Sequence, residues 1–226
     1  SHVVLKGSDG AALDVMAQFQ PLYLNDVNPE WSGTVHGNVL LKGTRASPLY
    51  DAQLTGEHIA LLNYRADYLS LQGNTIAGGR TQLAARGAVV SGQSLGNVQA
   101  ELIGKLSDGR LEASIQATDF SAQSAGRLQW TDAKQAYNAQ SFQVQVNEFG
   151  TWRLQAPMQI QLTDDSYQFS PFCLGNINHS AHVCAEDAVS AIAIDGREFP
   201  LFLLQPWLNN AGKEFTYSGN ATLKGE

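Results

Sequence analysis

Charge is scarce in this sequence. Asp, Glu, Lys and Arg make up 15% of its 226 residues, against roughly a quarter in ordinary soluble domains. Lys and Arg together number 14, and the formal net charge is −7. Neutralising nucleic-acid phosphates or docking on anionic lipid headgroups requires clustered basic residues. The composition therefore argues against a nucleic-acid partner and against electrostatic docking on such headgroups.

Long apolar runs and catalytic motifs are also missing. No run approaches the roughly 18 residues of a transmembrane helix, and no signal-peptide pattern opens the sequence. A nucleophile elbow, a metalloprotease helix, a P-loop and a Rossmann glycine fingerprint are all absent. The acidic pairs Asp164-Asp165 and Glu186-Asp187 lie beside turn residues, which is typical of solvated turns. We therefore predict no enzyme and no cofactor.

Apolar residues nevertheless reach 43%, and their order is informative. Apolar and polar side chains alternate with period 2 over residues 98–106, 111–117, 142–147 and 152–162. Successive side chains of a strand point to opposite faces of a sheet, so each run predicts a half-buried strand. Asp108-Gly109 between two such runs predicts a hairpin, and Pro157 predicts a bulge or an unpaired edge. The pattern is that of an all-β protein.

Strand-like runs also stand at both ends of the sequence, over residues 3–5 and 221–223. The run at the start recurs as VLLKG at 39–43 and ATLKG at 221–225, as expected for a strand and turn unit repeated in a β array. No linker-like composition interrupts the sequence. We expect residues 1–226 to form a single continuous β segment, excised from a longer chain.

One segment departs from the alternation. Residues 199–208, FPLFLLQPWL, are too densely apolar for a half-exposed strand. Pro200 near the start and Pro206 near the end predict a short amphipathic helix near 199–206 that covers an end of the sheet. A buried strand with a proline at its edge is the alternative.

The two cysteines, Cys173 and Cys184, enclose a short loop. Two neighbouring cysteines in a strand and turn context favour a local disulfide, and hence an oxidising compartment. A zinc site formed with His179 and His182 is the alternative, but the spacing matches no common zinc finger. We therefore predict a disulfide and no metal.

The alternation assigns one set of apolar side chains to the inward face of the sheet. Such a face must be covered by a second sheet or by helices, or be left open as a slot. The sequence offers a single helix candidate, so either the sheet closes into an ordinary packed core or it curls around a slot. The inward set is Leu54, Ile59, Leu61, Leu69, Leu71, Val98, Leu102, Leu111, Ile115, Leu128, Trp130, Phe142, Val144, Val146, Trp152, Leu154, Met158, Ile160, Leu162 and Phe169.

Four short stretches are informative together, in the order in which they occur. The first is WSGTVHG at 31–37, followed by LLKGT at 40–44 and Pro48. The second is GRLQW at 126–130, and the third is FGTWRLQAP at 149–157. The fourth is the pair Cys173 and Cys184, followed by FPL at 199–201. In this order the four stretches resemble the TamB (translocation and assembly module) family of AsmA-like bridge-type lipid transfer proteins.

The resemblance implies a long, curled, taco-like β-sheet with an apolar inner groove. It implies a periplasmic location in Gram-negative bacteria, within a protein anchored in the inner membrane, and transport of phospholipids between the two membranes. Phospholipid acyl chains and a TamA-like outer-membrane barrel protein are the implied partners, the latter through other parts of the full-length chain. The inward set then becomes the lining of the lipid groove. A structural or adhesive β-solenoid or sandwich with a closed core, and a carbohydrate-active β-sandwich enzyme, are the alternatives.

Overall fold

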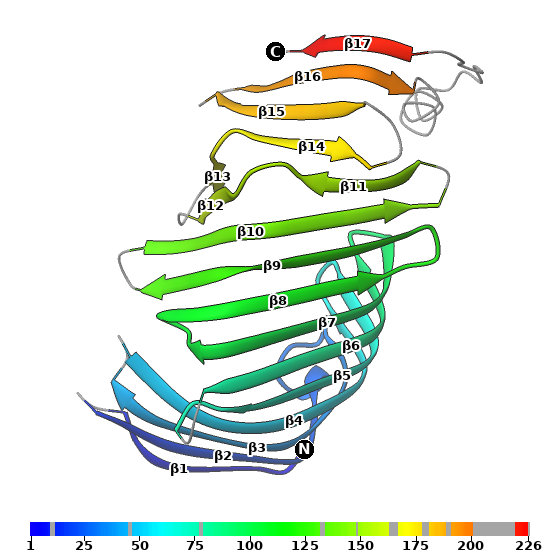
Figure 1. Ribbon diagram of the computed structural model, residues 1–226. Coiled ribbons are helices and arrows are strands. Elements are labelled where there is room, and N and C mark those ends of the chain that lie inside the picture. Colours follow the sequence, from blue (N-terminus) through cyan, green and yellow to red (C-terminus); the bar gives the residue numbers. More distant parts are fainter. Residues whose placement is uncertain are drawn as a thin grey trace.

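The chain folds into one antiparallel sheet. The computed structural model describes residues 1–9, 12–44, 47–76, 79–131, 134–147, 149–162, 167–177, 181–188, 191–200 and 220–225. These residues form a single sheet of seventeen strands. The sheet is a meander that follows chain order from β1 at the bottom of Figure 1 to β17 at the top.

The strands of the first half are long. They are β1 (Val3–Asp9), β2 (Leu13–Tyr23), β3 (Ser32–Thr44), β4 (Ser47–Leu61), β5 (Tyr64–Asn74), β6 (Arg80–Val90), β7 (Gln93–Lys105), β8 (Asp108–Gln116), β9 (Phe120–Thr131) and β10 (Lys134–Val146). Those of the second half are shorter on average: β11 (Gly150–Leu154), β12 (Met158–Leu162), β13 (Tyr167–Phe169), β14 (Phe172–Asn176), β15 (His182–Ala188), β16 (Ala191–Pro200) and β17 (Asn220–Gly225).

One break along the strands of the meander lies at Pro157. The sequence predicts one strand over 152–162, but the structure has two, β11 and β12, which pair with successive parts of β10. Arg153 lies opposite Gln143 and Met158 opposite Ala139, so the broken strand holds one residue more than β10 over the same interval. Proline lacks the N–H that would bond to a neighbouring strand, and the bulge or unpaired edge predicted at this residue is confirmed.

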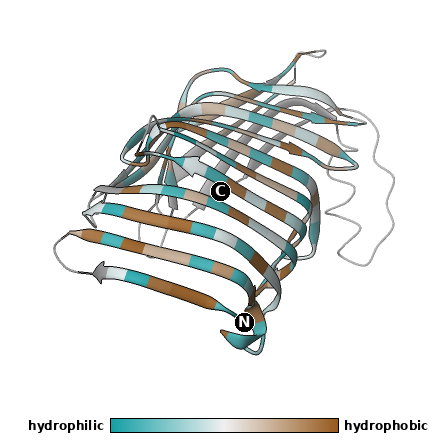
Figure 2. Ribbon diagram, turned by 90° about the horizontal axis from the view of Figure 1, so that it is seen from below, coloured by the Kyte–Doolittle hydropathy of each residue, from teal (hydrophilic) through white to brown (hydrophobic). Residues whose placement is uncertain are grey.

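The sheet is open and curled. Its strands bend along their length, so that the whole forms a curved wall (Figures 1 and 2). Strands β13 and β14 lie in line in the same way as β11 and β12. The seventeen strands therefore occupy fifteen positions, which at about 4.8 Å per position gives a wall roughly 70 Å long. The predicted fold class, an all-β curled sheet, is confirmed.

No second layer covers the sheet within the described residues. Most of their buried apolar residues are alanines, and none of their large side chains is less than 2% exposed. A sandwich or a closed globular domain would instead bury large aliphatic and aromatic side chains completely. The alternative of a closed, packed core is therefore wrong for the described part of the chain.

The predicted helix near 199–206 is wrong where it can be compared. Phe199 and Pro200 end strand β16 and lie opposite Ala221 and Asn220 of β17, in extended backbone. A proline at the end of a strand removes one donor from the ladder, which an edge tolerates. The rest of the predicted helix lies outside the described residues. The described ranges contain one 3-10 turn, Leu24–Asp26, and no helix in them has the length and apolar character to cross a membrane.

The predicted disulfide is present. Cys173 of β14 and Cys184 of β15 lie directly opposite each other, and their sulfur atoms are bonded. Both cysteines are consumed by this bond, so the zinc alternative is excluded. The bond ties together two of the short strands that follow the broken strand β11 and β12.

Replacing both cysteines, in a Cys173→Ala and Cys184→Ala variant, is expected to lower the free energy of unfolding by at most about 3 kcal/mol, because the bond closes a short loop in the unfolded chain. Urea unfolding with and without a reductant measures the effect. The reductant should lower the stability of the wild type by the same amount and leave the variant unchanged. A wild type that is indifferent to the reductant would contradict the disulfide.

Candidate functional site: the apolar face of the sheet

The pairing of residues between neighbouring strands places apolar side chains on one face of the sheet, from strand to strand. Residues directly opposite each other in an antiparallel pair point to the same side. Two rows of paired residues illustrate this face. The first row is Leu54, Leu71, Leu83, Ala100, Ala113, Ser124 and Phe142. The second row is Gly56, Leu69, Ala85, Val98, Ile115, Ala122, Val144 and Trp152.

Two further rows extend the face toward the other end of the strands. The third row is Thr81, Leu102, Leu111, Gly126, Ala139 and Met158. The fourth row is Gly104, Gly109, Leu128, Tyr137, Ile160 and Phe169. None of the residues in the four rows carries a charge. We call the side of the sheet defined by these four rows the apolar face, and the opposite side the polar face.

The apolar face is the crowded side of the curve. Leu102 and Ile103 are neighbours on β7 that point to opposite faces, yet Leu102 is 6% exposed and Ile103 is 47% exposed. Met16, which lies on the polar face of β2, is 50% exposed. Side chains converge on the concave side of a curved sheet and spread apart on the convex side. The difference therefore indicates that the apolar face is the inner side of the curl.

Most of the predicted inward residues lie in these rows. They are Leu54, Leu71 and Phe142 in the first row, Leu69, Val98, Ile115, Val144 and Trp152 in the second, Leu102, Leu111 and Met158 in the third, and Leu128, Ile160 and Phe169 in the fourth. Val146 and Leu154 follow two residues after Val144 and Trp152 on the same strands, and therefore share their face.

The remaining predicted residues lie toward strand ends. Ile59 follows His58, whose φ of 51° interrupts the alternation, and its side chain is buried next to Gly56. Leu61 ends β4 opposite the exposed Tyr64. Trp130 is 50% exposed near the end of β9 and is not enclosed. Leu162 holds a register position opposite Gln135.

Sequence reasoning missed part of this face. Val15, Ala17 and Phe19 of β2 alternate with polar residues and continue the apolar face through Val39 and Leu41 of β3. Their alternation would have identified them. The contribution of β6 is harder to find, because alanines occur on both of its faces and Gly87, at φ 62°, interrupts its phase.

A tyrosine also lies on the apolar face, where its hydroxyl is satisfied. Tyr50 reaches from β4 across β5 to β6, where its hydroxyl is 2.6 Å from that of Thr81. Gly73 lies beneath this contact, and a Cβ built there would come within 2.8 Å of the tyrosine ring and 2.7 Å of the threonine hydroxyl. The glycine therefore provides the space in which the ring lies across the sheet. Both hydroxyls are used within the protein.

The same arrangement recurs on β9 and β10. The hydroxyls of Tyr137 and Ser124 are 2.7 Å apart, and both residues belong to the rows of the apolar face. Burial raises the pKa of the Tyr137 hydroxyl above its ordinary value, although the Ser124 hydrogen bond lowers it. The phenol is therefore uncharged at neutral pH.

The second row continues beyond Trp152 to Asn176, which lies opposite it on β14. The polar side-chain groups of both residues also have hydrogen-bond partners. The Trp152 indole nitrogen donates to the Phe149 carbonyl oxygen at 3.1 Å, and the Asn176 side-chain nitrogen donates to the same oxygen at 2.8 Å. The polar groups of Tyr50, Thr81, Ser124, Tyr137, Trp152 and Asn176 are thus paired with one another or with the backbone. No group of three or more His, Cys, Asp or Glu side chains that could hold a metal ion occurs among the described residues.

The Tyr50 and Thr81 pair predicts a measurable coupling. Tyr50→Phe and Thr81→Val each remove one hydroxyl and leave the other without its partner, so each should cost about 1 kcal/mol of stability. The double variant should cost little more than either single change, and urea unfolding of all four proteins measures this. Tyr137→Phe, in the separate pair, should be additive with both. Simple additivity of Tyr50→Phe and Thr81→Val would contradict the contact.

Comparison with known proteins identifies the family. Residues 1–226 match the family model described as TamB, N-terminal domain. No curated protein and no solved structure matches the chain. TamB proteins are not a known enzyme family. Because the match spans the whole chain, and because the fold is the open curled sheet that the sequence predicted, this protein belongs to the TamB family of bacterial envelope proteins.

Proposed function

We propose that the apolar face carries the acyl chains of phospholipids between the inner and outer membranes. The observation that carries the proposal is the continuity of this face. Its four rows cross strand after strand without a charged residue, and no second layer covers them within the described residues. Each CH₂ group transferred from water to such a surface gains roughly 0.8 kcal/mol, which supports retention of acyl chains.

The paired hydroxyls support movement along this face as well as binding to it. A free hydroxyl in a water-poor slot would retain water or a headgroup oxygen, because a buried polar group without a partner is costly. Tyr50, Thr81, Ser124 and Tyr137 already satisfy one another. The surface that an acyl chain meets is therefore apolar and without strong local attachment points, as continuous transport requires.

The dimensions also fit. A lipid leaflet presents about half of the roughly 30 Å hydrocarbon core of a bilayer. The wall formed by the fifteen strand positions is roughly 70 Å long, so several acyl chains fit along it. The location in the periplasm, the inner-membrane anchor and the association with a TamA-like outer-membrane barrel belong to this proposal, with the last two residing in other parts of the full-length protein.

A photo-crosslinking amino acid at Met158 of the full-length protein in cells should form adducts with phospholipid, since Met158 lies on the apolar face. The matched control is Gln159, its neighbour on the polar face of the same strand. Mass spectrometry of the purified adducts measures the difference. Equal lipid labelling at both positions, or none at Met158, would contradict an acyl-chain path along the apolar face.

A charge placed on the apolar face should stop transport without unfolding the sheet. Leu154→Arg puts a cation on the half-buried inner side of β11, where an uncovered slot can still hydrate it. Gln155→Arg adds the same charge at an exposed position. Transfer of labelled phospholipid between the membranes should fail only in the first variant, while circular dichroism shows folded protein in both. Unfolding of the Leu154→Arg variant would indicate a closed core instead.

A further inference from the structure

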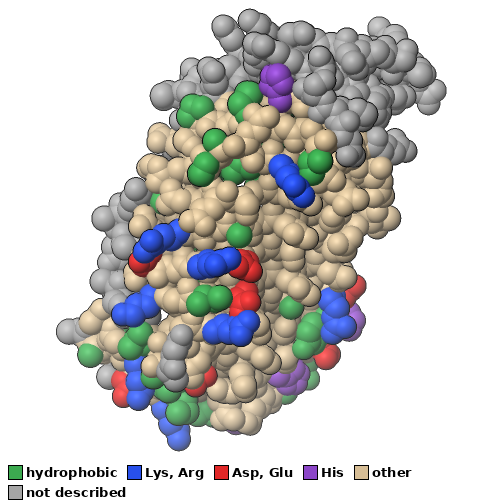
Figure 3. Space-filling model, in the orientation of Figure 1, with side chains coloured by type: hydrophobic (Ala, Val, Ile, Leu, Met, Phe, Trp, Pro, Cys, Tyr) green, Lys and Arg blue, Asp and Glu red, His purple; other side chains and the backbone are tan. Residues whose placement is uncertain are grey.

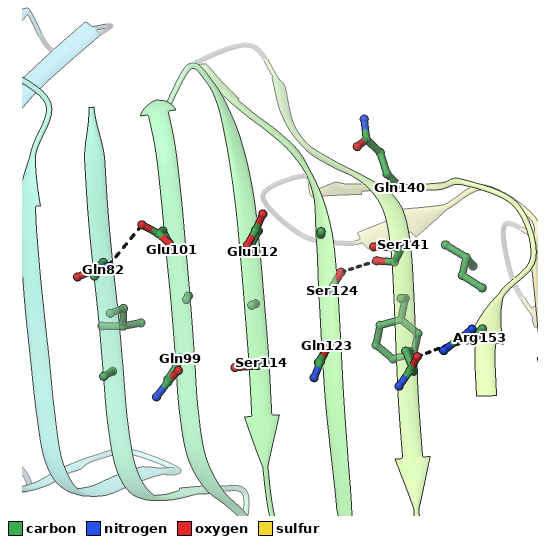
Figure 4. Close-up of a pocket in the computed structure, with 18 residues that line it drawn as sticks. Gln82, Gln99, Glu101, Glu112, Ser114, Gln123, Ser124, Gln140, Ser141 and Arg153 are labelled. Carbon is green, nitrogen blue, oxygen red and sulfur yellow. Dashed lines mark hydrogen bonds between the residues drawn. The ribbon is translucent and has the colours of Figure 1, made fainter. Parts of the chain in front are cut away.

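The polar face carries a hollow that the lipid function does not use. It has a volume of about 770 Å³ and crosses six strands, from β6 to β11 (Figure 4). A twisted and curled sheet is saddle-shaped, so each of its faces can be hollowed along one direction. The side of the molecule shown in Figure 3 carries scattered basic and acidic groups among uncharged surface and smaller hydrophobic patches.

Two rows of polar-face residues form the walls of this hollow. One row is Gln82, Glu101, Glu112, Ala125 and Ser141, and the other is Ala84, Gln99, Ser114, Gln123, Gln143 and Arg153. Gln140 joins them at the bulge between Ala139 and Ser141. Leu83, Phe142 and Leu154 also border the hollow, but the register points their side chains to the apolar face. The floor is therefore backbone, and the walls are mostly amides and hydroxyls.

Several of these polar groups are free to bind a ligand. Among the described residues, the side chains of Gln99, Ser114, Gln123 and Gln140 have no hydrogen-bond partner. They present amide donors, amide acceptors and a hydroxyl along the hollow, as Figure 4 shows. A set of this kind recognises hydroxyl and amide groups.

Charge within the hollow is balanced. Glu101 and Glu112 lie directly opposite each other, which is unfavourable for two carboxylates. Arg80 pairs with Glu101 and lowers its pKa, and Arg110 pairs with Glu112 at 2.7 Å. Arg153 donates to the Gln143 side chain at 2.7 Å. No cluster of one sign remains for a phosphate, a nucleic acid or a metal ion, and no apolar side chain larger than alanine points into the hollow.

We propose that this hollow binds a linear, uncharged glycan that lies across the strands. Strand positions recur about every 4.8 Å along each wall, which is close to the length of one pyranose ring, and all of them carry polar side chains except Ala125 in one wall and Ala84 in the other. Most sugars would then meet one polar group from each wall. An extended peptide advances about 3.3 Å per residue and loses step with the strands. The hollow lacks an aromatic ring on which a sugar could stack, so binding is weak and suits passing contact with a polymer.

Saturation-transfer NMR of the full-length protein tests the proposal, with chitohexaose and cellohexaose as probes. The wild type should transfer saturation to at least one of them. A Gln99→Leu and Gln123→Leu variant should bind roughly tenfold more weakly, because it loses two pairs of amide hydrogen bonds. The control is Gln145→Leu, on the polar face of β10 but outside the hollow, which should bind as the wild type does. Matching melting temperatures show that the variants are folded.

The failure of this proposal is distinguishable from failure of the lipid function. Met158→Arg should leave saturation transfer to the glycan unchanged, because Met158 lies on the apolar face and outside the hollow. No transfer to either glycan, equal binding by the double variant and the wild type, or binding of an extended uncharged peptide in place of the glycans would each overturn the glycan site.

Discussion

Strand register is the constraint on which the rest of this protein depends. Side chains alternate between the two faces along each regular stretch of strand, so a slip of one residue would move the apolar side chains of that stretch to the polar face. The sheet has no second layer in the described residues that could correct such a slip by packing. The rows from Leu54 to Phe142 and from Gly56 to Trp152 stay in phase because the pairings hold across bulges such as the one between Ala139 and Ser141.

An open apolar face places unusual demands on the polar residues that it contains. In a closed core, a buried tyrosine needs a partner so that folding is not penalised. Here the partners of Tyr50 and Tyr137 are hydroxyls on the same face, Thr81 and Ser124. The pairing keeps the surface apolar toward whatever occupies it. Stability and the character of the surface are thus provided by the same contacts.

Much of this architecture could be predicted from the sequence, because side-chain direction in a strand is a local property. Alternation alone placed Val98, Ile115 and Met158 on one face, and Pro157 marked the broken strand. The inward position of Tyr50 was missed because its hydroxyl is a polar group. Only the structure shows that this hydroxyl has Thr81 as its partner on the same face. The extended backbone at Phe199 was missed because dense apolar residues resemble a helix when pairing with β17 is unknown. The polar hollow depends on the register of six strands, which no single stretch of sequence contains.

The broken strand formed by β11 and β12 changes the direction in which the sheet continues. Between the rung of Gln123, Gln143 and Arg153 and the rung of Gly126, Ala139 and Met158, the backbone takes three steps along β9, four along β10 and five along β11 and β12. The two sets of paired residues are separated by more residues on each successive strand, so they diverge across the sheet. The direction of the strand pairing therefore turns within the plane of the sheet. A groove formed by such a sheet need not be straight. The number of residues inserted between paired positions can therefore determine the direction in which the groove runs across the envelope.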